Sequence, residues 1–395
     1  MKPLEGIRIL AIEQYGAGPY ATLHLADLGA EVIKIEDPST KGDVSRSVIP
    51  YSENNDSLFF QGLNRNKKSI TLNLKTEEGR KIFHGLVEKS DAVFNNLRGD
   101  VPEKLKITYN HLKDVNPKIV TCSLSGFGSW GSMTKEPAYD YLLQAMNGHM
   151  SLTGEPGGPP SKYGLSIVDF SSGMMGALAL MVGIYKAQQQ GVGADVDVSL
   201  FDTSLSVVNY LATWHLNKGY EPVRTANSAH PTLVPSQQFP TKDGHVVIMC
   251  NKEKFFPLLC EGLEAPKLAK NEKYKNFQSR FDHKEELIGE LTEILQTETS
   301  AYWLERLKGK VPIAPVNTIA EALKQPLVME RNMIVDADSP TFGTVKMLGT
   351  PIKVSDYQPS YTCGPSLGEH NELIYGDLLD LKSEHLEKLQ LDGVI

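Results

Sequence analysis

The N-terminal part of the chain alternates apolar runs with helix-like runs, and this alternation restricts the fold more than any other feature. Residues 7–12 have the continuous apolar pattern of a buried strand, and residues 31–35 are predicted to form the next one. Between them, Pro19 suits the first turn of a helix that continues to Leu28, and Gly29 suits its end. This order is that of a βαβ unit.

A second unit of the same kind follows. Thr76 is predicted to open a helix whose apolar residues share one face. Residues 91–94 and 118–124 are then predicted as strands. Repeated alternation of this kind predicts an α/β fold with a parallel, doubly wound sheet.

The pattern changes from about Asn227 onward. A strand-like run at 245–249 and a helical run at 284–295 are followed by a helix through Leu307 with Ser300 as its expected cap. Together with residues 312–316, these segments predict a smaller α+β domain.

Composition limits the possible partners. The chain has 395 residues, of which 41% are hydrophobic, so it has material for two domains with cores of their own. A net charge of -8 argues against a general nucleic-acid binder, which would carry a basic face. The four cysteines are scattered without metal-ligand spacing, which predicts free thiols in a reducing compartment.

Export and membrane insertion are not expected. Glu5 and Arg8 interrupt what would have to be the apolar region of a secretory signal. The longest apolar stretch, residues 173–185, falls short of the roughly twenty residues that a membrane span needs, and we predict a buried helix there. We therefore expect a cytoplasmic protein with neither a membrane nor a nucleic acid as partner.

Asp169 is the residue with the clearest chemical potential. It stands where an extended run, residues 161–168, gives way to a small-residue helical run. A carboxylate at such a junction either caps the helix, by accepting hydrogen bonds from its first N–H groups, or serves as a nucleophile. The helix dipole favours the ionised form in both cases. The segment alone leaves these alternatives open.

Other catalytic motifs are weak or absent. Residues 126–131 formally match the dinucleotide pattern GxGxxG, but a poor helix opening that ends in Pro137 follows them. Cys122 lies in a predicted core strand, where a thiol is inert. There is no phosphate loop, zinc helix or nucleophile elbow. We therefore expect no metal and no tightly bound cofactor.

An ordered series of short motifs runs along nearly the whole chain, from Leu4 to Ile395. In that order and at those spacings, the series resembles the family III CoA-transferases, which include the formyl-CoA and carnitine CoA-transferases and the related acyl-CoA racemases. The motifs are Leu28–Glu36, Asn64–Ser69, Phe127-Gly128, Pro137–Asp140, Gln144–Gly148, Leu152–Pro160, the segment ending in Asp169, Gly193–Asp202, Thr241–Gly244 and Leu367–His370.

The resemblance implies a fold and an assembly. The fold would be a Rossmann-like, doubly wound large domain formed by both ends of the chain, with a smaller α+β domain inserted late. We accordingly expect a large CoA-binding domain at 1–225, a small domain at 226–331 and a return to the large domain at 332–395. Two chains would thread through each other as an interlocked, ring-like homodimer.

The resemblance also implies a CoA-transferase reaction with Asp169 as nucleophile. CoA would pass from an acyl-CoA donor to a small carboxylic acid through an aspartyl anhydride and an aspartyl-CoA thioester, so CoA is expected only as part of substrate and product. The motif positions carried over as CoA contacts are Leu72, Asn96, Leu97, Lys104, Leu105 and Tyr139. Gly16 and Tyr139 are carried over as substrate contacts.

This chain also departs from the family pattern. Racemases of the family have His where this chain has Tyr139, and formyl-CoA/oxalate enzymes have Gln where it has Gly16. An arginine that often stacks on the CoA adenine is replaced by Asp37. The alternatives to a CoA-transferase are a racemase, isomerase or hydratase of acyl-CoA, and a catalytically silent CoA-binding protein.

Overall fold

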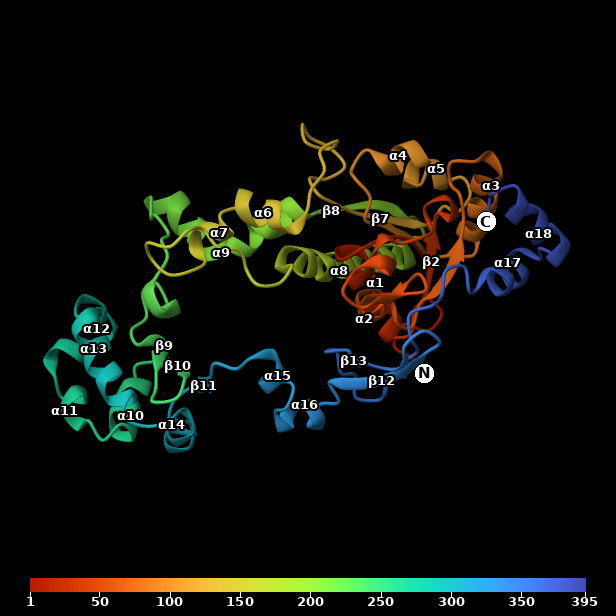
Figure 1. Cartoon of the computed structure of the whole chain (residues 1–395). Helices are drawn as coiled ribbons and strands as arrows, with labels where there is room; N and C mark the ends of the chain where they lie inside the picture. The colour runs from red at the N-terminus through yellow and green to blue at the C-terminus, as the bar shows by residue number, and fades with distance from the viewer. The chain divides into compact units, whose positions relative to one another are not determined.

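The computed structural model describes residues 1–395, which form two compact units (Figure 1). The first unit contains Met1–Asn147, Tyr163–Ala212 and Leu327–Ile395, and the second contains Gly148–Lys162 and Thr213–Pro326. The second unit overlaps most of the small domain expected at 226–331, but its main segment starts earlier, at Thr213, and ends earlier, at Pro326. It also includes Gly148–Lys162, which was expected in the large domain. The assignment of 1–225, 226–331 and 332–395 to domains stays a prediction.

A sheet of six parallel strands organises the first unit. In spatial order the strands are β5 (Lys68–Thr71), β2 (Glu31–Glu36), β1 (Arg8–Ile12), β6 (Ala92–Asn95), β7 (Val120–Ser125) and β8 (Ala194–Ser199). The chain runs outward from β1 through β2 to β5 and then returns to β6 on the other side of β1. The expected strands are thus present, and the strand order reverses between β1 and β6, where doubly wound sheets bind their ligands.

Each face of the sheet has its own hydrophobic core. On one face, the strands pack under α1 (Ala17–Asp27) and α8 (Ile167–Gln190). The other face is covered by α3 (Glu77–Glu88), α17 (Asn371–Leu379) and α18 (Ser383–Leu391). Figure 1 shows the blue C-terminal helices α17 and α18 beside the orange α3. Helices on both faces confirm a mixed α/β fold around a parallel sheet.

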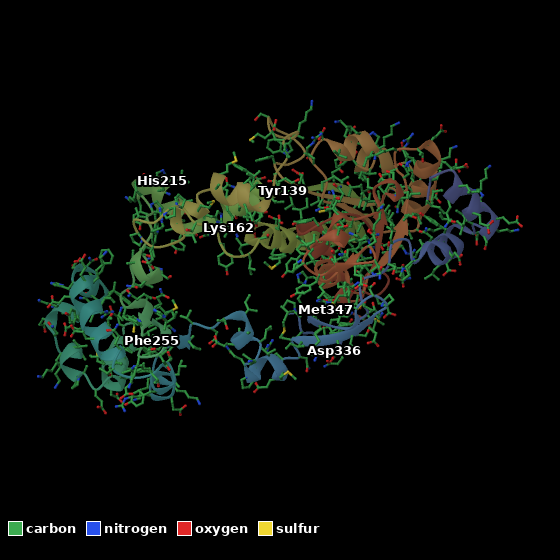
Figure 2. The ribbon with its side chains drawn as sticks, viewed as in Figure 1. Tyr139, Lys162, His215, Phe255, Asp336 and Met347 are labelled. Carbon is green, nitrogen blue, oxygen red and sulfur yellow. The ribbon has the colours of Figure 1, made fainter.

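The remaining elements of the first unit are short. The helices are α2 (Leu58–Asn64), α4 (Val101–Leu105), α5 (Tyr109–Leu112), α6 (Asp140–Met146) and α16 (Pro326–Glu330), and α9 (Leu200–Lys218) runs from this unit into the second. The short strands β3 (Ser52–Glu53) and β4 (Asp56–Ser57) pair with each other. Strands β12 (Ile334–Ser339) and β13 (Gly343–Leu348) form a hairpin on which Figure 2 labels Asp336 and Met347.

The second unit has a separate core around a three-stranded antiparallel sheet. Its strands are β9 (Ser236–Pro240), β10 (His245–Met249) and β11 (Ile313–Pro315), and its helices are α7 (His149–Leu152), α10 (Phe255–Gly262), α11 (Pro266–Ala269), α12 (Phe277–Asp282), α13 (Lys284–Leu295), α14 (Ser300–Leu307) and α15 (Ile319–Ala322). Figure 2 labels Phe255 at the start of α10. The expected runs at 245–249, 284–295 and 300–307 are confirmed.

Two predicted caps have different outcomes. The Thr76 hydroxyl accepts a hydrogen bond from the N–H of Gly79, which confirms Thr76 as the cap of α3. Ser300 is not the cap of α14, because the hydroxyl of Thr299 accepts the hydrogen bond from Tyr302. Both residues suit a cap, and the one just outside the helix takes the position.

Helix α8 has a small-residue face and an exposed apolar face. Its buried residues include Gly173, Gly176 and Gly183, which let it lie close to α1 and to strand β7. The prediction of a buried helix at 173–185 is therefore only half right, because the other face is open and apolar. Its exposed residues are Met174, Met175, Leu178, Val182 and Tyr185. By length and composition alone α8 could cross a membrane, a test that core helices of soluble proteins also pass.

Candidate active site

The candidate site lies where the strand order reverses, beyond the C-terminal ends of β1 and β6. A cavity of about 540 Å³ opens there. It brings together four of the predicted site residues, Gly16, Asn96, Tyr139 and Asp169, and a fifth, Leu97, at its edge. These residues are far apart in the sequence, and the sheet topology brings them together.

Asp169 is the third residue of α8 and does not cap the helix. The capping carboxylate belongs to Asp140, the first residue of α6, whose Oδ2 accepts hydrogen bonds from the N–H groups of Val168 (2.6 Å) and Asp169 (3.1 Å). The Nε2 of Gln144 donates to the other oxygen of Asp140 at 2.5 Å. The capping alternative for Asp169 is therefore wrong, and its carboxylate accepts no hydrogen bond within the chain.

Asp169 ionises less readily than the helix dipole alone would predict. Burial raises the pKa of its carboxyl group to about 7, and the negative charge of Asp140 adds to the effect. Both effects disfavour the charged form and outweigh the helix N-terminus. A carboxyl group whose pKa lies near neutrality, in a cavity, is a feature of reactive sites.

Gly16 lies directly against Asp169. A Cβ atom at Gly16 would lie 2.9 Å from Oδ2 of Asp169, closer than a side chain is normally tolerated. A larger residue at position 16 would therefore require the Asp169 carboxylate to shift from the position it has here. The neighbouring Gly18 has a similar relation to Asn96, because a Cβ there would lie 2.6 Å from the Asn96 side chain.

The side chain of Asn96 is already used within the protein. Its amide donates to the carbonyl oxygen of Gln14 and accepts from the N–H of Gln14, both at 2.8 Å. Asn96 therefore fixes the backbone of the loop that follows β1. Tyr139, in contrast, is 68% exposed at the start of α6, where Figure 2 labels it, and no neighbouring side chain covers its ring.

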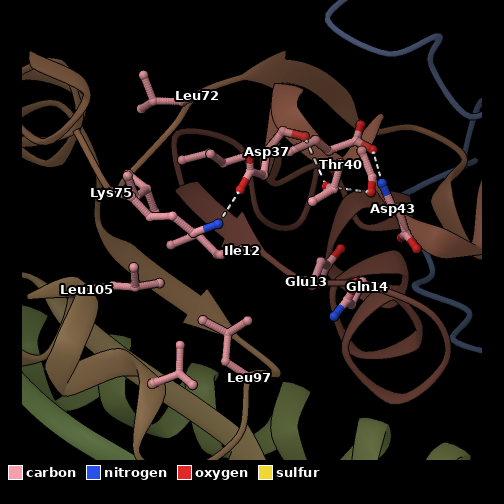
Figure 3. A pocket seen from close by; sticks show the side chains of 15 residues that line it. Ile12, Glu13, Gln14, Asp37, Thr40, Asp43, Leu72, Lys75, Leu97 and Leu105 are labelled. Atoms are coloured by element: carbon pink, nitrogen blue, oxygen red, sulfur yellow. Dashed lines mark hydrogen bonds and ion pairs between the residues drawn. The ribbon is translucent and has the colours of Figure 1, made fainter. Parts of the chain in front are cut away.

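A second cavity, of about 300 Å³, adjoins the first and shares Gln14 and Leu97 with it. Two further predicted CoA contacts, Leu72 and Leu105, line it (Figure 3). At its rim the carboxylate of Asp37 accepts a hydrogen bond from the ammonium of Lys75 at 3.0 Å, the ion pair drawn in Figure 3. Lys75 thus partly neutralises the charge of Asp37, the residue that stands where the family often has an arginine.

Lys104 is the one predicted contact that lines neither cavity. Its ammonium lies 2.5 Å from Oδ2 of Asp100. The two oxygens of the same carboxylate each accept one hydrogen bond from Arg98. Hydrogen bonds from Arg98 and Lys104 hold the pKa of Asp100 well below its usual range. Arg98 is the only cationic residue lining the larger cavity, and sequence reasoning did not select it.

Sequence reasoning also missed a group of buried charges beside the site. Lys34 pairs with Asp43, Lys67 with Glu13, and Arg46 with Glu36, all with nearly fully buried side chains. The signal was present, because Lys34 and Glu36 interrupt the apolar run of β2. Charges in a buried strand require partners.

Comparisons with known proteins agree with one another. The sequence pattern of CoA-transferase family III matches residues 4–371. Mouse succinyl-CoA:glutarate CoA-transferase is 33% identical over 400 residues, covering 100% of this chain and 91% of the mouse protein. Succinyl-CoA:mesaconate CoA-transferase of Haloarcula hispanica is 35% identical over 390 residues, covering 96% of each chain.

A solved structure gives the same result for the fold. A CaiB/BaiF family protein from Brucella suis superimposes with a TM-score of 0.82 at 33% identity, covering 95% of this chain and 99% of the other. The agreement extends over both units, so the likeness concerns the whole chain.

Proposed function

This chain belongs to CoA-transferase family III and is a CoA-transferase, and from that premise we propose that Asp169 carries the transferred groups covalently. One observation supports this most directly. The Asp169 carboxylate faces the larger cavity with no hydrogen-bond partner of its own, beside a glycine that leaves room for a substrate. A carboxylate free of partners is available to attack.

The proposed reaction has four steps. An oxygen of Asp169 attacks the thioester carbonyl of the donor, which forms a mixed anhydride and releases the CoA thiolate. The thiolate then attacks the aspartyl carbonyl, so that an aspartyl-CoA thioester forms and the donor acid leaves. The acceptor carboxylate attacks that thioester and gives a second anhydride. The thiolate finally attacks the acceptor acyl carbonyl, which yields the new acyl-CoA and regenerates Asp169.

The two adjoining cavities suit an acyl-CoA. We propose that the smaller cavity, with Leu72, Leu97 and Leu105, takes the nucleotide end of CoA, and that the thioester reaches Asp169 across Gln14 and Leu97. Tyr139 lies at the mouth of the larger cavity, where its ring can cover the pantetheine arm. CoA enters and leaves as part of substrate and product, and the reaction requires no tightly bound cofactor.

Small dicarboxylates are the proposed substrates. The relatives act on succinyl-CoA with glutarate or mesaconate, and a relative from Acetobacter aceti that is 36% identical acts on acetyl-CoA with oxalate. Arg98 in the larger cavity is a cation suited to a second carboxylate group. No histidine lines this cavity, so the racemase alternative lacks its proton carrier there.

We further propose that the enzyme works as an interlocked homodimer in the cytoplasm. The apolar residues of α8 that the single chain leaves open support the dimer, because monomers rarely expose a continuous stripe of this kind. The free cysteines support a reducing compartment.

Isotope transfer tests the covalent role of Asp169. In the four steps, one oxygen of the acceptor acid ends in the Asp169 carboxylate in each turnover. After turnover with an ¹⁸O-labelled dicarboxylate, mass spectrometry should find ¹⁸O in the peptide that contains Asp169 and in no other acidic peptide. Intact-protein spectra with succinyl-CoA should also show a CoA-sized adduct.

The Asp169→Asn variant is the matched control, because it keeps the size of the side chain. It should fold, form no adduct and lose activity by at least about 10³-fold. Turnover by wild type without label in Asp169, or an adduct on the Asn variant, would show that the nucleophile lies elsewhere.

A further inference from the structure

The loop between β1 and α1, residues 13–16, forms the wall of the cavity opposite Asp169. Its last residue is Gly16, whose Cα lies against the Asp169 carboxylate. The residue before it, Tyr15, has φ +66°, a left-handed conformation that is unfavourable for a tyrosine. A backbone in this conformation persists only where its surroundings hold it.

Side chains from three other segments hold the loop at each of its first three residues, and two of them, Lys34 and Asp43, are buried. Lys34 donates to the carbonyl oxygen of Glu13 at 2.8 Å, and Asn96 bonds both backbone groups of Gln14. The N–H of Tyr15 donates to Oδ1 of Asp43 at 3.0 Å. No regular secondary structure stabilises this loop, so these contacts determine its path.

Asp43 is suited to this task because its charge is balanced. Its Oδ2 lies 2.8 Å from the ammonium of Lys34, and both side chains are inaccessible to solvent. Burial by itself would raise the pKa of the Asp43 carboxyl group. The positive charge of Lys34 outweighs burial, so the pKa of Asp43 lies below its usual value. Asp43 is therefore a fixed anion. Its Oδ1 also accepts from the N–H of Ser45 at 2.8 Å, which anchors the carboxylate to its own loop.

We propose that Asp43, neutralised by Lys34, is a positioning residue for the transfer reaction: by holding the N–H of Tyr15 it keeps Gly16 against Asp169 and so keeps water from the reacting carboxylate. This inference rests on the proposed role of Asp169 as nucleophile. Anhydride and thioester intermediates hydrolyse readily, so a wall that stays closed around them protects each turnover. Asp43 itself touches no reacting atom.

Two double variants isolate the hydrogen bond to Tyr15. Asp43→Asn with Lys34→Met removes the ion pair but keeps an oxygen that can accept from Tyr15. Asp43→Ala with Lys34→Met removes the ion pair and the acceptor together. Both variants lack the lysine donor to Glu13, so their difference reports the acceptor oxygen at residue 43, which serves the N–H groups of Tyr15 and Ser45.

The expected difference is in turnover. The kcat of the Ala pair should be at least about tenfold below that of the Asn pair, with KM values for acyl-CoA that agree within about threefold. Hydrolysis of acyl-CoA relative to transfer should rise in the Ala pair. Equal kcat values in the two folded pairs, or a loss confined to KM, would overturn the inference.

The pH profile separates positioning from simple loss of folded enzyme. Asp140 faces Asp169 from α6, and Tyr15, Arg98, Glu136 and Tyr139 line the same cavity; none of these residues differs between the pairs. If Gly16 withdraws, water reaches Asp169, and the acid limb of kcat/KM should move to lower pH in the Ala pair. An unmoved limb would mean that the Ala pair is only less folded, which contradicts the inference.

Hydrogen exchange gives a test that needs no variant. In the wild-type enzyme, the amide of Tyr15 should exchange slowly although its side chain is exposed, because Asp43 holds its N–H. Fast exchange would overturn the inference even if both variants failed to fold. The ¹⁸O label in Asp169 is measured separately. An unlabelled Asp169 contradicts the proposed function. A labelled Asp169 together with fast exchange of the Tyr15 amide contradicts only this inference.

Discussion

Two carboxylates at the start of α8 have different tasks because their surroundings differ. Asp140 accepts two backbone N–H groups and the amide of Gln144, whereas Asp169 accepts none and is buried beside that charge. Burial and Asp140 raise the pKa of Asp169 to about 7. The attacking form is the deprotonated one, so activity should rise with pH as Asp169 loses its proton.

The raised pKa of Asp169 also affects stability. Because the folded state binds this proton more tightly than the unfolded state, the contribution of Asp169 is most favourable below its unfolded pKa and is lost as pH rises toward about 7. Asp169→Asn removes the ionisation. It should raise the free energy of unfolding by about 1–2 kcal/mol near pH 8, less than the full shift would give because Asp169 is only partly buried.

Urea unfolding at several pH values measures this effect. The stabilisation by Asp169→Asn should shrink as pH falls and approach zero only below the unfolded pKa of 3.8, where the aspartic acid is protonated in both states. A stabilisation that does not depend on pH would mean that Asp169 ionises in the folded protein as readily as in the unfolded one.

Among the elements, α8 determines the site geometry, because its first turn carries Asp169 and its small-residue face sets its distance from α1. A Cβ atom at Gly173 would lie 2.7 Å from the carbonyl oxygen of Ala17, in the first turn of α1. The residue before Ala17 is Gly16. The packing of the two helices therefore places Asp169 against the loop.

Gly173→Ala should push α8 away from α1. We expect a loss of about 1–3 kcal/mol in the free energy of unfolding and a lower kcat. The atoms that the new Cβ would meet are backbone atoms of α1 and a packed ring atom of Tyr20, which cannot move aside. Gly289→Ala in α13 is the matched control. Its Cβ would meet nothing within 4 Å, so it should stabilise the protein by a few tenths to about 1 kcal/mol. Thermal unfolding and steady-state kinetics of both variants provide the measurement.

The elements also show how far sequence reasoning extends. Strands β1, β2, β6 and β7 of the main sheet and the helices α3, α8 and α13 follow from local apolar patterns, and Asp169 from a motif order, whereas the edge strands β5 and β8 were not predicted. The cap provided by Asp140 joins residues 28 positions apart, and the hold of Asp43 on Tyr15 joins two loops. Periodicity carries no information on such contacts, because they arise only when parallel strands place separate loops at one edge of the sheet.

At the scale of the whole molecule, the open apolar face of α8 predicts assembly. Leu178→Lys with Val182→Lys should place two charges in the proposed dimer contact, whereas Leu391→Lys changes a still more exposed leucine on α18. The first variant should sediment as a monomer at concentrations where the wild type and the Leu391 variant are dimers. Dimers of unchanged stability in the α8 variant would place the contact on another face.

The contact of α17 with β5 has a consequence for biosynthesis. The side chains of Asn371 and Tyr375 bond the backbone of Thr71, beside the cavity residue Leu72, about 300 positions earlier in the chain. At about 5–20 residues per second, a ribosome needs roughly 15–60 s to deliver these partners after Thr71 is made. During most of that interval α3 is the only one of the three covering helices that has been made, so part of one apolar face of the nascent sheet is uncovered. We therefore expect chaperones to bind the growing polypeptide, and the contacts that hold Thr71 beside the cavity residue Leu72 form only when translation is nearly finished.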